Sequence, residues 1–453
     1  MTEAPALAAP PRFRGRLPLF QFLRTVRDSS VATYGEHAFE REVFERRILW
    51  QRYLVVNAPA GVQHVLLDNA GNYVKSRIAR RLLEPGLGRG LLTSEGEDWR
   101  RQRRIMAPAF DHRSLVAYVP TMTEATAALS ERWSRLPEGA TIDAAADMMR
   151  LTLAIIARAM FSTDAESVSA VVEQAVGRYQ VEVRPNLFDL LGVPERWQRG
   201  RARGWQEIFG EFDALIERLI RRESVDGEQP RDLLARLIAA RDSETGLGMS
   251  AKEVRDQVVT IFMAGHETTA QGLAWTWYLL SQHPREEAKV HAELASVLGG
   301  RVPRFEDIAS LRYTRMVFEE AMRLYPPAHT ISRQALAEDK VAGRKVRKGS
   351  TVFIVPWLLH RHRLLWERPD VFDPERFAPE RATGRHRFAY IPFGGGPRIC
   401  IGAAFAMTEA LVILATLAQR YRLRLAPGHP VEPVGLITLR PRHGLRMILE
   451  RRS

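Results

Sequence analysis

Cys400 is the first residue whose type and setting could support chemistry, and it is the only cysteine among the 453 residues. It lies in residues 393–402, FGGGPRICIG, where three glycines allow positive φ angles and a close approach of the backbone to a flat group. Backbone N–H groups of such a loop, and a helix starting just after it, favour a negatively charged sulfur. A lone cysteine elsewhere is typically a small buried apolar residue, but this context predicts a thiolate bonded to a metal.

A second polar group, AGHETT, occupies residues 264–269. Taken alone, its paired threonines would indicate a polar patch that faces another helix. The group falls in the middle of a segment with helical apolar periodicity, where buried polar side chains need hydrogen-bond partners. Glycine in a helix interior also costs about 1 kcal/mol relative to alanine. We therefore expect a specific use for this stretch.

Three further spacings involve arginine. Glu320 and Arg323 form E-x-x-R, and residues 374–377 read PERF about 50 residues later. Trp99 and Arg103 form W-x-x-x-R in a basic segment. Each pattern has an ordinary explanation when taken alone, since i,i+3 ion pairs and basic helix faces are common on protein surfaces.

A long helix must position the 264–269 stretch. Ser250 and Glu253 form a capping box, and His283-Pro284 ends the apolar periodicity because proline forbids continuation. The helix has about 33 residues, or roughly 50 Å, so it must cross the molecule. The pattern is almost wholly helical from Trp99 to Phe318, with an exposed turn at 226–230. A last helix is expected from Ala403 to Gln419.

Short β-like runs are expected in the rest of the chain. Alternating apolar residues between Phe39 and Leu67 predict a small sheet, and residues 351–355 and 435–438 read as further strands. The fold class is therefore mainly α with a small β-sheet region. We expect an irregular N-terminal lead-in over 1–38 and a single domain over 39–453, with β-rich parts near 39–70 and 333–360.

Composition narrows the class of protein. One cysteine cannot form an internal disulfide. The formal net charge of +13 comes from basic residues spread along the chain, without zinc-finger or RNP-like motifs. An acidic protein partner, or a plain contribution to solubility, therefore explains the charge better than nucleic-acid binding. The first 23 residues are too polar and proline-rich for a signal peptide or a membrane anchor. We expect a soluble, cytoplasmic protein.

The stretch 393–402 resembles the haem-binding loop of cytochromes P450, F-x-x-G-x-R-x-C-x-G. The family's other motifs are also present and in the family's order, including A-G-x-(D/E)-T-T at 264–269. The resemblance covers about residues 40 to 450. The resemblance implies a cytochrome P450 fold with a long central helix over the haem, and a haem-thiolate monooxygenase. Thiolate ligation pushes electron density onto the iron and favours O–O cleavage. The cofactor implied is haem b (iron protoporphyrin IX), with dioxygen as co-substrate.

The resemblance also implies roles for single residues. Glu267 and Thr268 are the acid–alcohol pair for proton delivery, and Cys400 is the iron ligand. Glu320, Arg323 and Arg376 form a buried structural triad. The implied haem-binding residues are Trp99, Arg103, Ala264, Gly265, Arg333, Phe393, Gly396, Arg398, Cys400 and Gly402. Arginine suits propionates because its fork meets a carboxylate bidentately.

By the same analogy, the substrate pocket is expected to include Phe262, Met263, His329, Thr330, Leu436 and Ile437. These residues are mostly apolar, so a fatty acid, terpenoid, steroid or aromatic substrate is expected. His329, or the arginines at 77, 80 and 81, could recognise a carboxylate.

Electrons are expected from a ferredoxin or flavodoxin with its NAD(P)H reductase, and the protein is expected to be a monomer. Arg100, Arg101 and Arg104 could supply a basic docking face for that partner, or could be ordinary solvated arginines. Two alternatives stay open. One is a peroxide-driven oxygenase or isomerase, which generally lacks the acid–threonine pair. The other is a haem sensor without catalysis.

Overall fold

The computed structural model describes residues 7–15, 17–48, 51–161, 210, 213–218 and 232–452. The turn predicted at 226–230 lies outside these residues. Helices make up most of the described chain: α1 (Leu19–Asp28), α2 (Pro59–Gln63), α3 (Arg77–Leu87), α4 (Gly96–Met106), α5 (His112–Ser134), α6 (Ala144–Phe161), α10 (Leu233–Ala239), α11 (Ala251–Gln282), α12 (Pro284–Leu298), α13 (Arg312–Leu324), α14 (Pro356–Leu359), α15 (Pro379–Ala382) and α16 (Ala403–Ala418).

The strands form small sheets. They are β1 (Val43–Ile48), β2 (Gln51–Val56), β3 (Tyr73–Lys75), β4 (Thr141–Asp143), β5 (Ile331–Ala335), β6 (Asp339–Val341), β7 (Arg344–Val346), β8 (Thr351–Ile354), β9 (Tyr421–Leu425), β10 (Pro433–Gly435), β11 (Leu439–Pro441) and β12 (Arg446–Arg451). The largest sheet has the order β1-β2-β8-β5-β3, in which β2 and β8 run parallel and the other neighbours antiparallel. A smaller sheet has the order β4-β12-β9.

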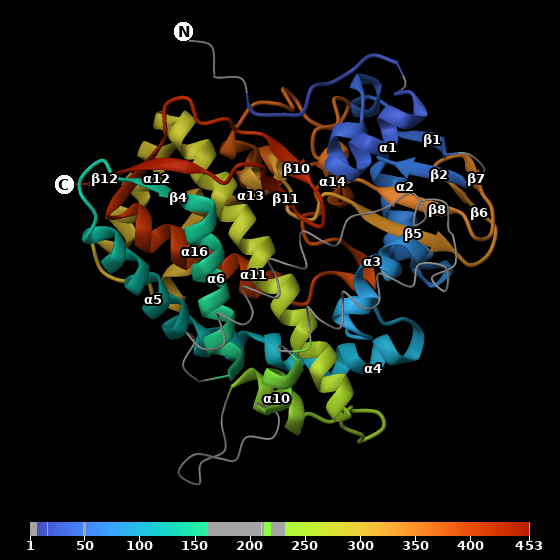
Figure 1. The fold of residues 1–453 in the computed structure, drawn as a ribbon, viewed down its shortest axis with the longest axis horizontal. Coiled ribbons are helices and arrows are strands. Elements are labelled where there is room, and N and C mark those ends of the chain that lie inside the picture. Colours follow the sequence, from blue (N-terminus) through green and yellow to red (C-terminus); the bar gives the residue numbers. More distant parts are fainter. Residues whose placement is uncertain are drawn as a thin grey trace.

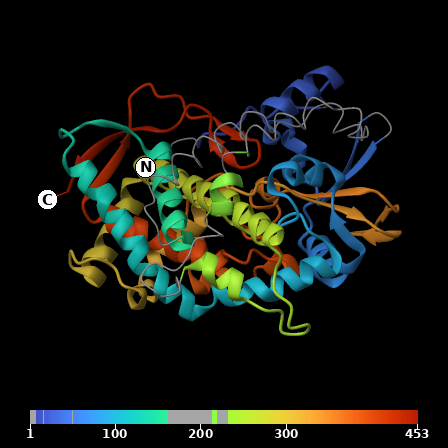
Figure 2. The same ribbon diagram turned by 60° about the horizontal axis from the view of Figure 1, so that its bottom comes forward.

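The largest sheet and most of the long helices lie on different sides of the molecule. Strands β1, β2, β5 and β8 lie on the right in Figure 1, and α5, α6, α12 and α16 lie on the left. The turned view in Figure 2 keeps this division, with the blue and orange strands again on the right. Because strands 43–56 pair with strands 331–354, the ends of the chain on either side of the helical body are joined in one sheet.

Helix α11 runs diagonally through the centre of the view in Figure 1 and has 32 residues. Its capping box is formed, since Ser250 Oγ accepts from the Glu253 N–H and the Glu253 side chain accepts from the Ser250 N–H. The chain turns at His283 and α12 begins at Pro284. Most of the helix is buried against α6, α13 and α16. The predicted central helix is therefore confirmed, with its start and end.

The predicted irregular lead-in is wrong in part, because Leu19–Asp28 form the amphipathic helix α1. Its buried Phe22 packs with Tyr53 of β2. The guanidinium carbon of Arg46 lies 4.7 Å from the Phe22 ring centroid. A single buried aromatic anchors this helix to the sheet, and such a tertiary contact is not visible in the local pattern.

Two of the predicted strand regions were wrong in part. Residues 59–68 within the predicted β region form helical turns, with Pro59 at the first helical position, where proline is well tolerated. Residues 436–438 are the turn between β10 and β11 and not a strand, with the Leu436 N–H donating to the Thr438 carbonyl at 3.1 Å. An apolar run of four residues cannot separate a strand from a buried turn.

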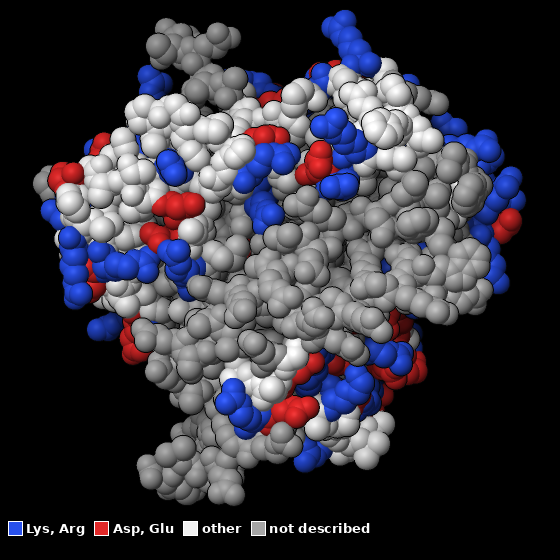
Figure 3. Space-filling view, viewed as in Figure 1, with Lys and Arg blue, Asp and Glu red and all other residues white. Residues whose placement is uncertain are grey.

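The charged side chains show no single basic patch on the face drawn in Figure 3. There the described Lys and Arg side chains are interspersed with Asp and Glu. Among the residues that the structure describes, no helix is both long enough and apolar enough to cross a membrane.

Candidate functional site

The cysteine loop is shaped by glycine. Gly394 and Gly396 have φ angles of +74° and +67°, which side chains rarely adopt. A Cβ on Gly396 would lie 1.7 Å from the Leu66 carbonyl oxygen, so only glycine fits there. The Cys400 N–H donates to the Phe393 carbonyl at 2.9 Å, which closes the loop three residues before α16 begins at Ala403.

The Cys400 side chain keeps an exposed face at the start of α16. Burial raises the pKa of its thiol, while the Gly402 N–H and the Arg103 guanidinium lower it. The Arg103 Nη1 donates to the Ile399 carbonyl at 2.8 Å, so this cation is held beside the loop. A donor N–H and a cation next to an accessible sulfur are what a thiolate ligand requires.

Arg398 of the cysteine loop packs against Trp99 of α4. The guanidinium carbon of Arg398 is 4.3 Å from the Trp99 ring centroid. Its Nη1 donates to the Ser94 carbonyl at 3.2 Å, and its Nη2 forms an ion pair with Glu95. The structure thus brings together two of the predicted propionate-binding residues, which are 299 positions apart (398 − 99) in the sequence.

Cations outnumber anions around this pair. Burial lowers the pKa of Lys75 to about 6, with Arg398 adding to the decrease, Glu95 opposing it, and Arg333 and Arg80 adding further. Burial, then Arg398, lowers the pKa of Arg333 to about 10, against Glu95. The Arg80 Nε is buried with no hydrogen-bond partner among the described residues. Such a cluster calls for an anionic ligand, and two propionates of a haem would supply its missing charge.

Three residues of α11 border an accessible space. Ala264, Gly265 and Thr268 retain partial exposure in a stretch whose other members, from 258 to 281, are buried. A Cβ on Gly265 would meet Ile156 at no less than 3.7 Å, so protein packing does not require glycine there. The Thr268 Oγ1 donates to the Ala264 carbonyl at 2.8 Å. Small residues and a hydroxyl thus face a space that a flat cofactor and dioxygen would fill.

Glu267 is buried and points to a different part of the chain. Its Oε1 accepts a hydrogen bond from the Thr438 hydroxyl at 2.5 Å, in the turn between β10 and β11. Neither Lys75, Glu95 nor Thr438 was expected from the sequence. No local motif marks them, and only their tertiary neighbours reveal them.

The predicted pocket segments meet at this turn. The His329 Nε2 lies 3.0 Å from the Leu436 carbonyl, and its Nδ1 lies 2.9 Å from the Thr330 hydroxyl. Leu436, Ile437 and Thr330 keep accessible surface. Helix α11, the segment around His329 and the 436–438 turn therefore converge.

Two pocket residues differ from expectation. Phe262 has no accessible surface and stacks on Phe161, with ring centroids 5.2 Å apart, so it belongs to the core. His329 is buried, and burial lowers its pKa to about 4, against the hydrogen bond to Leu436. Both ring nitrogens have partners and the lowered pKa favours a neutral ring, so these contacts favour a His329 that fixes the turn over one that binds a carboxylate.

Glu320, Arg323 and Arg376 form a buried cluster. The Glu320–Arg323 contact is 2.6 Å and the Glu320–Arg376 contact is 3.3 Å, with both partners of each buried. The Arg323 Nη1 also donates to the His360 and Pro369 carbonyls at 2.7 Å. The cluster ties α13 to the segment before the cysteine loop, which is a structural task.

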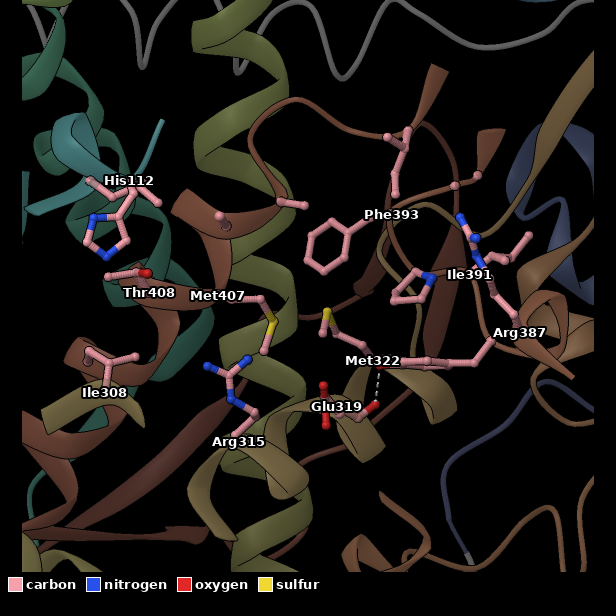
Figure 4. A pocket seen from close by; sticks show the side chains of 18 of the residues that line it. His112, Ile308, Arg315, Glu319, Met322, Arg387, Ile391, Phe393, Met407 and Thr408 are labelled. Carbon is pink, nitrogen blue, oxygen red and sulfur yellow. Dashed lines mark hydrogen bonds between the residues drawn. The ribbon is translucent and has the colours of Figure 1, made fainter. Parts of the chain in front are cut away.

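A cavity of about 660 Å³ borders the cysteine loop without reaching Cys400 or Thr268. Figure 4 shows Phe393 of the loop, Met407 of α16 and Met322 of α13 around it, and Arg315, Glu319 and Arg387 also line it. Its lining does not include Ala264 of α11.

The three arginines that were expected to dock a redox partner form ion pairs within the chain. Arg101 pairs with Glu253, Arg104 pairs with Asp242, and Arg100 contacts Glu97.

Comparisons with known proteins agree with this site. The family model described as "Cytochrome P450" matches residues 10–443. The chain is 41% identical over 398 residues to cyclooctatin synthase of Streptomyces melanosporofaciens, covering 87% of this chain and 85% of that protein. It is 37% identical to cyclooctat-9-en-7-ol 5-monooxygenase of the same organism, covering 85% and 83%.

Other similar proteins extend this pattern. Pentalenene oxygenase of Streptomyces avermitilis is 34% identical, with coverage of 81% of each chain. The crystal structure of the cytochrome P450DA haem domain superposes with a TM-score of 0.81 at 27% identity, covering 99% of this chain and 98% of that one. Sequence and fold thus agree over nearly the whole length.

Proposed function

The chain belongs to the cytochrome P450 family, and from that premise we propose roles for its site residues, its substrate class and its electron donor. It is a haem-thiolate monooxygenase, which inserts one atom of dioxygen into a hydrophobic organic substrate and uses two electrons from a separate redox partner. The observation that carries the proposed roles is the accessible Cys400 thiol, which its glycine loop holds beside Arg103. The basic side chains of Lys75, Arg80, Arg333 and Arg398 gather around Glu95 in front of that loop.

In this proposal, Cys400 is the iron ligand of a haem b. Lys75, Arg80, Arg333 and Arg398 hold the propionates, and Trp99 keeps the Arg398 guanidinium in place. The haem supplies the activation of dioxygen and the oxygen transfer, and the protein supplies the ligand, the orientation and the protons. Ala264 and Gly265, which are small and partly exposed, would let the haem and dioxygen approach α11.

Thr268 and Glu267 are the residues that we propose for proton delivery. The Thr268 hydroxyl donates its proton to the Ala264 carbonyl, so the lone pairs of its oxygen remain able to accept a hydrogen bond from a ligand. Glu267, one residue earlier, is a carboxyl that can bring protons inward. In this proposal the Thr268 hydroxyl would hold the bound oxygen by hydrogen bonding and Glu267 would supply protons to it, which are the roles that general acid catalysis requires.

Thr268→Ala tests this role. We expect the variant to retain its haem and substrate binding, while the product formed per electron pair falls about 10-fold or more and hydrogen peroxide rises, consistent with the roughly 100-fold scale of a lost proton-transfer group. The matched control is Thr276→Ala, two turns along α11, whose hydroxyl makes the same local bond to Gly272 at 2.7 Å. Normal coupling in Thr268→Ala would refute the role.

The substrate we propose is a cyclic hydrocarbon, or an alcohol derived from one. Two relatives carry names that refer to pentalenene and to the unsaturated alcohol cyclooctat-9-en-7-ol. The accessible surface near the site comes from Ala264, Gly265, Leu436 and Ile437, with the two hydroxyl-bearing residues Thr268 and Thr330. Because burial lowers the pKa of His329, such a pocket favours a hydrocarbon or an alcohol over a carboxylate. Screening such hydrocarbons against fatty acids by the shift of the haem Soret band tests this, and preferential binding of fatty acids would contradict it.

For the electron donor we propose a small acidic ferredoxin or flavodoxin with its NAD(P)H reductase, which docks on a monomer of this chain. Arg315 and Arg387 line the cavity that borders the cysteine loop, and so offer positive charge on that side of the loop. Arg387→Glu should slow the first electron transfer several-fold at low salt, and the difference should shrink at high salt. Arg344→Glu, on the β6–β7 hairpin, is the control. Equal rates for both variants would exclude this docking face.

A further inference from the structure

The turn between β10 and β11 is held from several sides. The Leu439 N–H donates to the Pro327 carbonyl at 3.0 Å, and the Trp275 Nε1 of α11 donates to the Leu439 carbonyl at 3.0 Å. At the other end, the Ser30 N–H donates to the Gly435 carbonyl at 2.8 Å. His329 holds the Leu436 carbonyl. A turn fixed at each end is a rigid platform for the residue at its tip.

Thr438 sits on that platform, with its side chain aimed at α11. Its hydroxyl donates to the Glu267 Oε1 at 2.5 Å, across 171 positions in the sequence. Thr438 is 5% exposed and Glu267 is 3% exposed, so water does not compete for this bond. A hydroxyl has a single proton, and here that proton is committed to the carboxylate.

The two members of the acid–alcohol pair are therefore anchored differently. Thr268 is bonded to the carbonyl of Ala264, one turn back in its own helix. Glu267 is bonded to a separate element that reaches α11 from the C-terminal end of the chain. The alcohol moves only with the helix, whereas the position of the acid depends on the turn.

We propose that Thr438 is a positioning residue for Glu267, which ties the orientation of the acid to the turn that carries the substrate-bordering residues Leu436 and Ile437. The inference rests on the proposed role of Glu267 in proton delivery. Leu436 and Ile437 have accessible surface, and the Leu436 N–H is bonded to the Thr438 carbonyl. A molecule that contacts Leu436 or Ile437 would therefore touch the same turn that orients the acid.

The first experiment measures the tether without turnover. Thr438→Val removes the hydroxyl at nearly constant volume, and Glu267→Leu removes its acceptor. We expect Thr438→Val to lower the urea midpoint of the purified holoprotein, and to lower it much less in the Glu267→Leu background. The control is Thr152→Val, because Thr152 is also buried and donates to α11 at the His266 carbonyl, at 2.9 Å. Its effect should be the same in both backgrounds. Additive effects of Thr438→Val and Glu267→Leu would overturn the tether.

The second experiment measures positioning. Thr438→Val should reduce product per electron pair at least threefold and change the solvent deuterium isotope effect on product formation, while Thr438→Ser restores both. A merely structural threonine would change stability but not the isotope effect. Should Glu267→Leu lower coupling while Thr438→Val couples like the wild type, Thr438 has no positioning role. Should Glu267→Leu itself couple normally, the proposed role of Glu267 fails, and this inference fails with it.

If Thr438→Val does not fold, Glu267→Asp serves instead. Its carboxylate is shorter by one methylene group and cannot keep the 2.5 Å bond from the same backbone position. It should reproduce the loss of coupling with the acid still present. Full coupling in Glu267→Asp would overturn the proposal.

Discussion

The guanidinium carbon of Arg398 lies 4.3 Å from the centroid of the Trp99 ring, while its Nη2 pairs with Glu95. The indole holds the guanidinium by a cation–π contact, and the carboxylate fixes its plane. Lys75 and Arg333 lie near enough for Arg398 to lower the pKa of each. The cluster is thus pre-arranged and short of negative charge, as expected for a propionate site.

Arg398→Leu should weaken haem retention. Charge-assisted hydrogen bonds contribute about 1.5–3 kcal/mol, which corresponds to a roughly 10- to 100-fold faster loss of haem. Haem transfer to excess apomyoglobin measures the rate. Arg344→Leu, an exposed cation on β7, is the control and should behave like the wild type. An unchanged rate in Arg398→Leu would remove this residue from the propionate site.

Cys400→His should abolish the absorption band that marks thiolate ligation in the reduced carbon monoxide complex. The sequence has no second cysteine to replace it. Ile399→Val, at the neighbouring exposed position, should keep the band and so shows that the loop tolerates substitution. Persistence of the thiolate-type band in Cys400→His would exclude Cys400 as the iron ligand.

Glu320→Gln should destabilise the protein strongly. The change leaves Arg323 and Arg376 buried without their shared carboxylate, and breaking a buried pair costs about 3–5 kcal/mol. Urea unfolding measures the loss. Glu338→Gln is the matched control, because Glu338 pairs with Lys345 on the surface and such pairs contribute about 0–1 kcal/mol. Similar small losses in both variants would contradict a structural role for the triad.

Glu409→Gln should change how stability depends on pH. Burial raises the pKa of Glu409 from 4.5 to about 8, opposed by a hydrogen bond with Thr269. Between these values the unfolded chain releases the proton and the folded chain keeps it. This group therefore makes stability fall as pH rises, by up to about 1.4 kcal/mol per pH unit, until the folded group also ionises near pH 8.

The neutral amide of Glu409→Gln removes that slope. The free energy of unfolding of the variant, relative to the wild type, should therefore rise from pH 5 to pH 8 and then level off. Urea unfolding at four pH values measures it, with Glu338→Gln as a control whose difference should stay flat. A flat difference for Glu409→Gln would show that the carboxyl ionises normally in the folded state.

Short-range patterns in the sequence were enough for the parts that depend on neighbours along the chain. The capping box at Ser250, the stop at His283-Pro284 and the glycine loop before Cys400 are local, so the central helix and the loop were predicted with their bounds. Helix α1 and the 436–438 turn were not, because one buried aromatic and a set of long-range hydrogen bonds decide them.

The sequence by itself determined which groups are present: one thiol, a glycine loop, and an acid next to an alcohol in a long helix. Only the tertiary structure decided their partners. Lys75 lies close to Arg398, and Glu267 is hydrogen-bonded to Thr438, although the members of each pair are far apart in the sequence. The physical reason is that hydrogen bonds and charge interactions depend on distance in space, which helix packing and strand pairing set and local periodicity does not record.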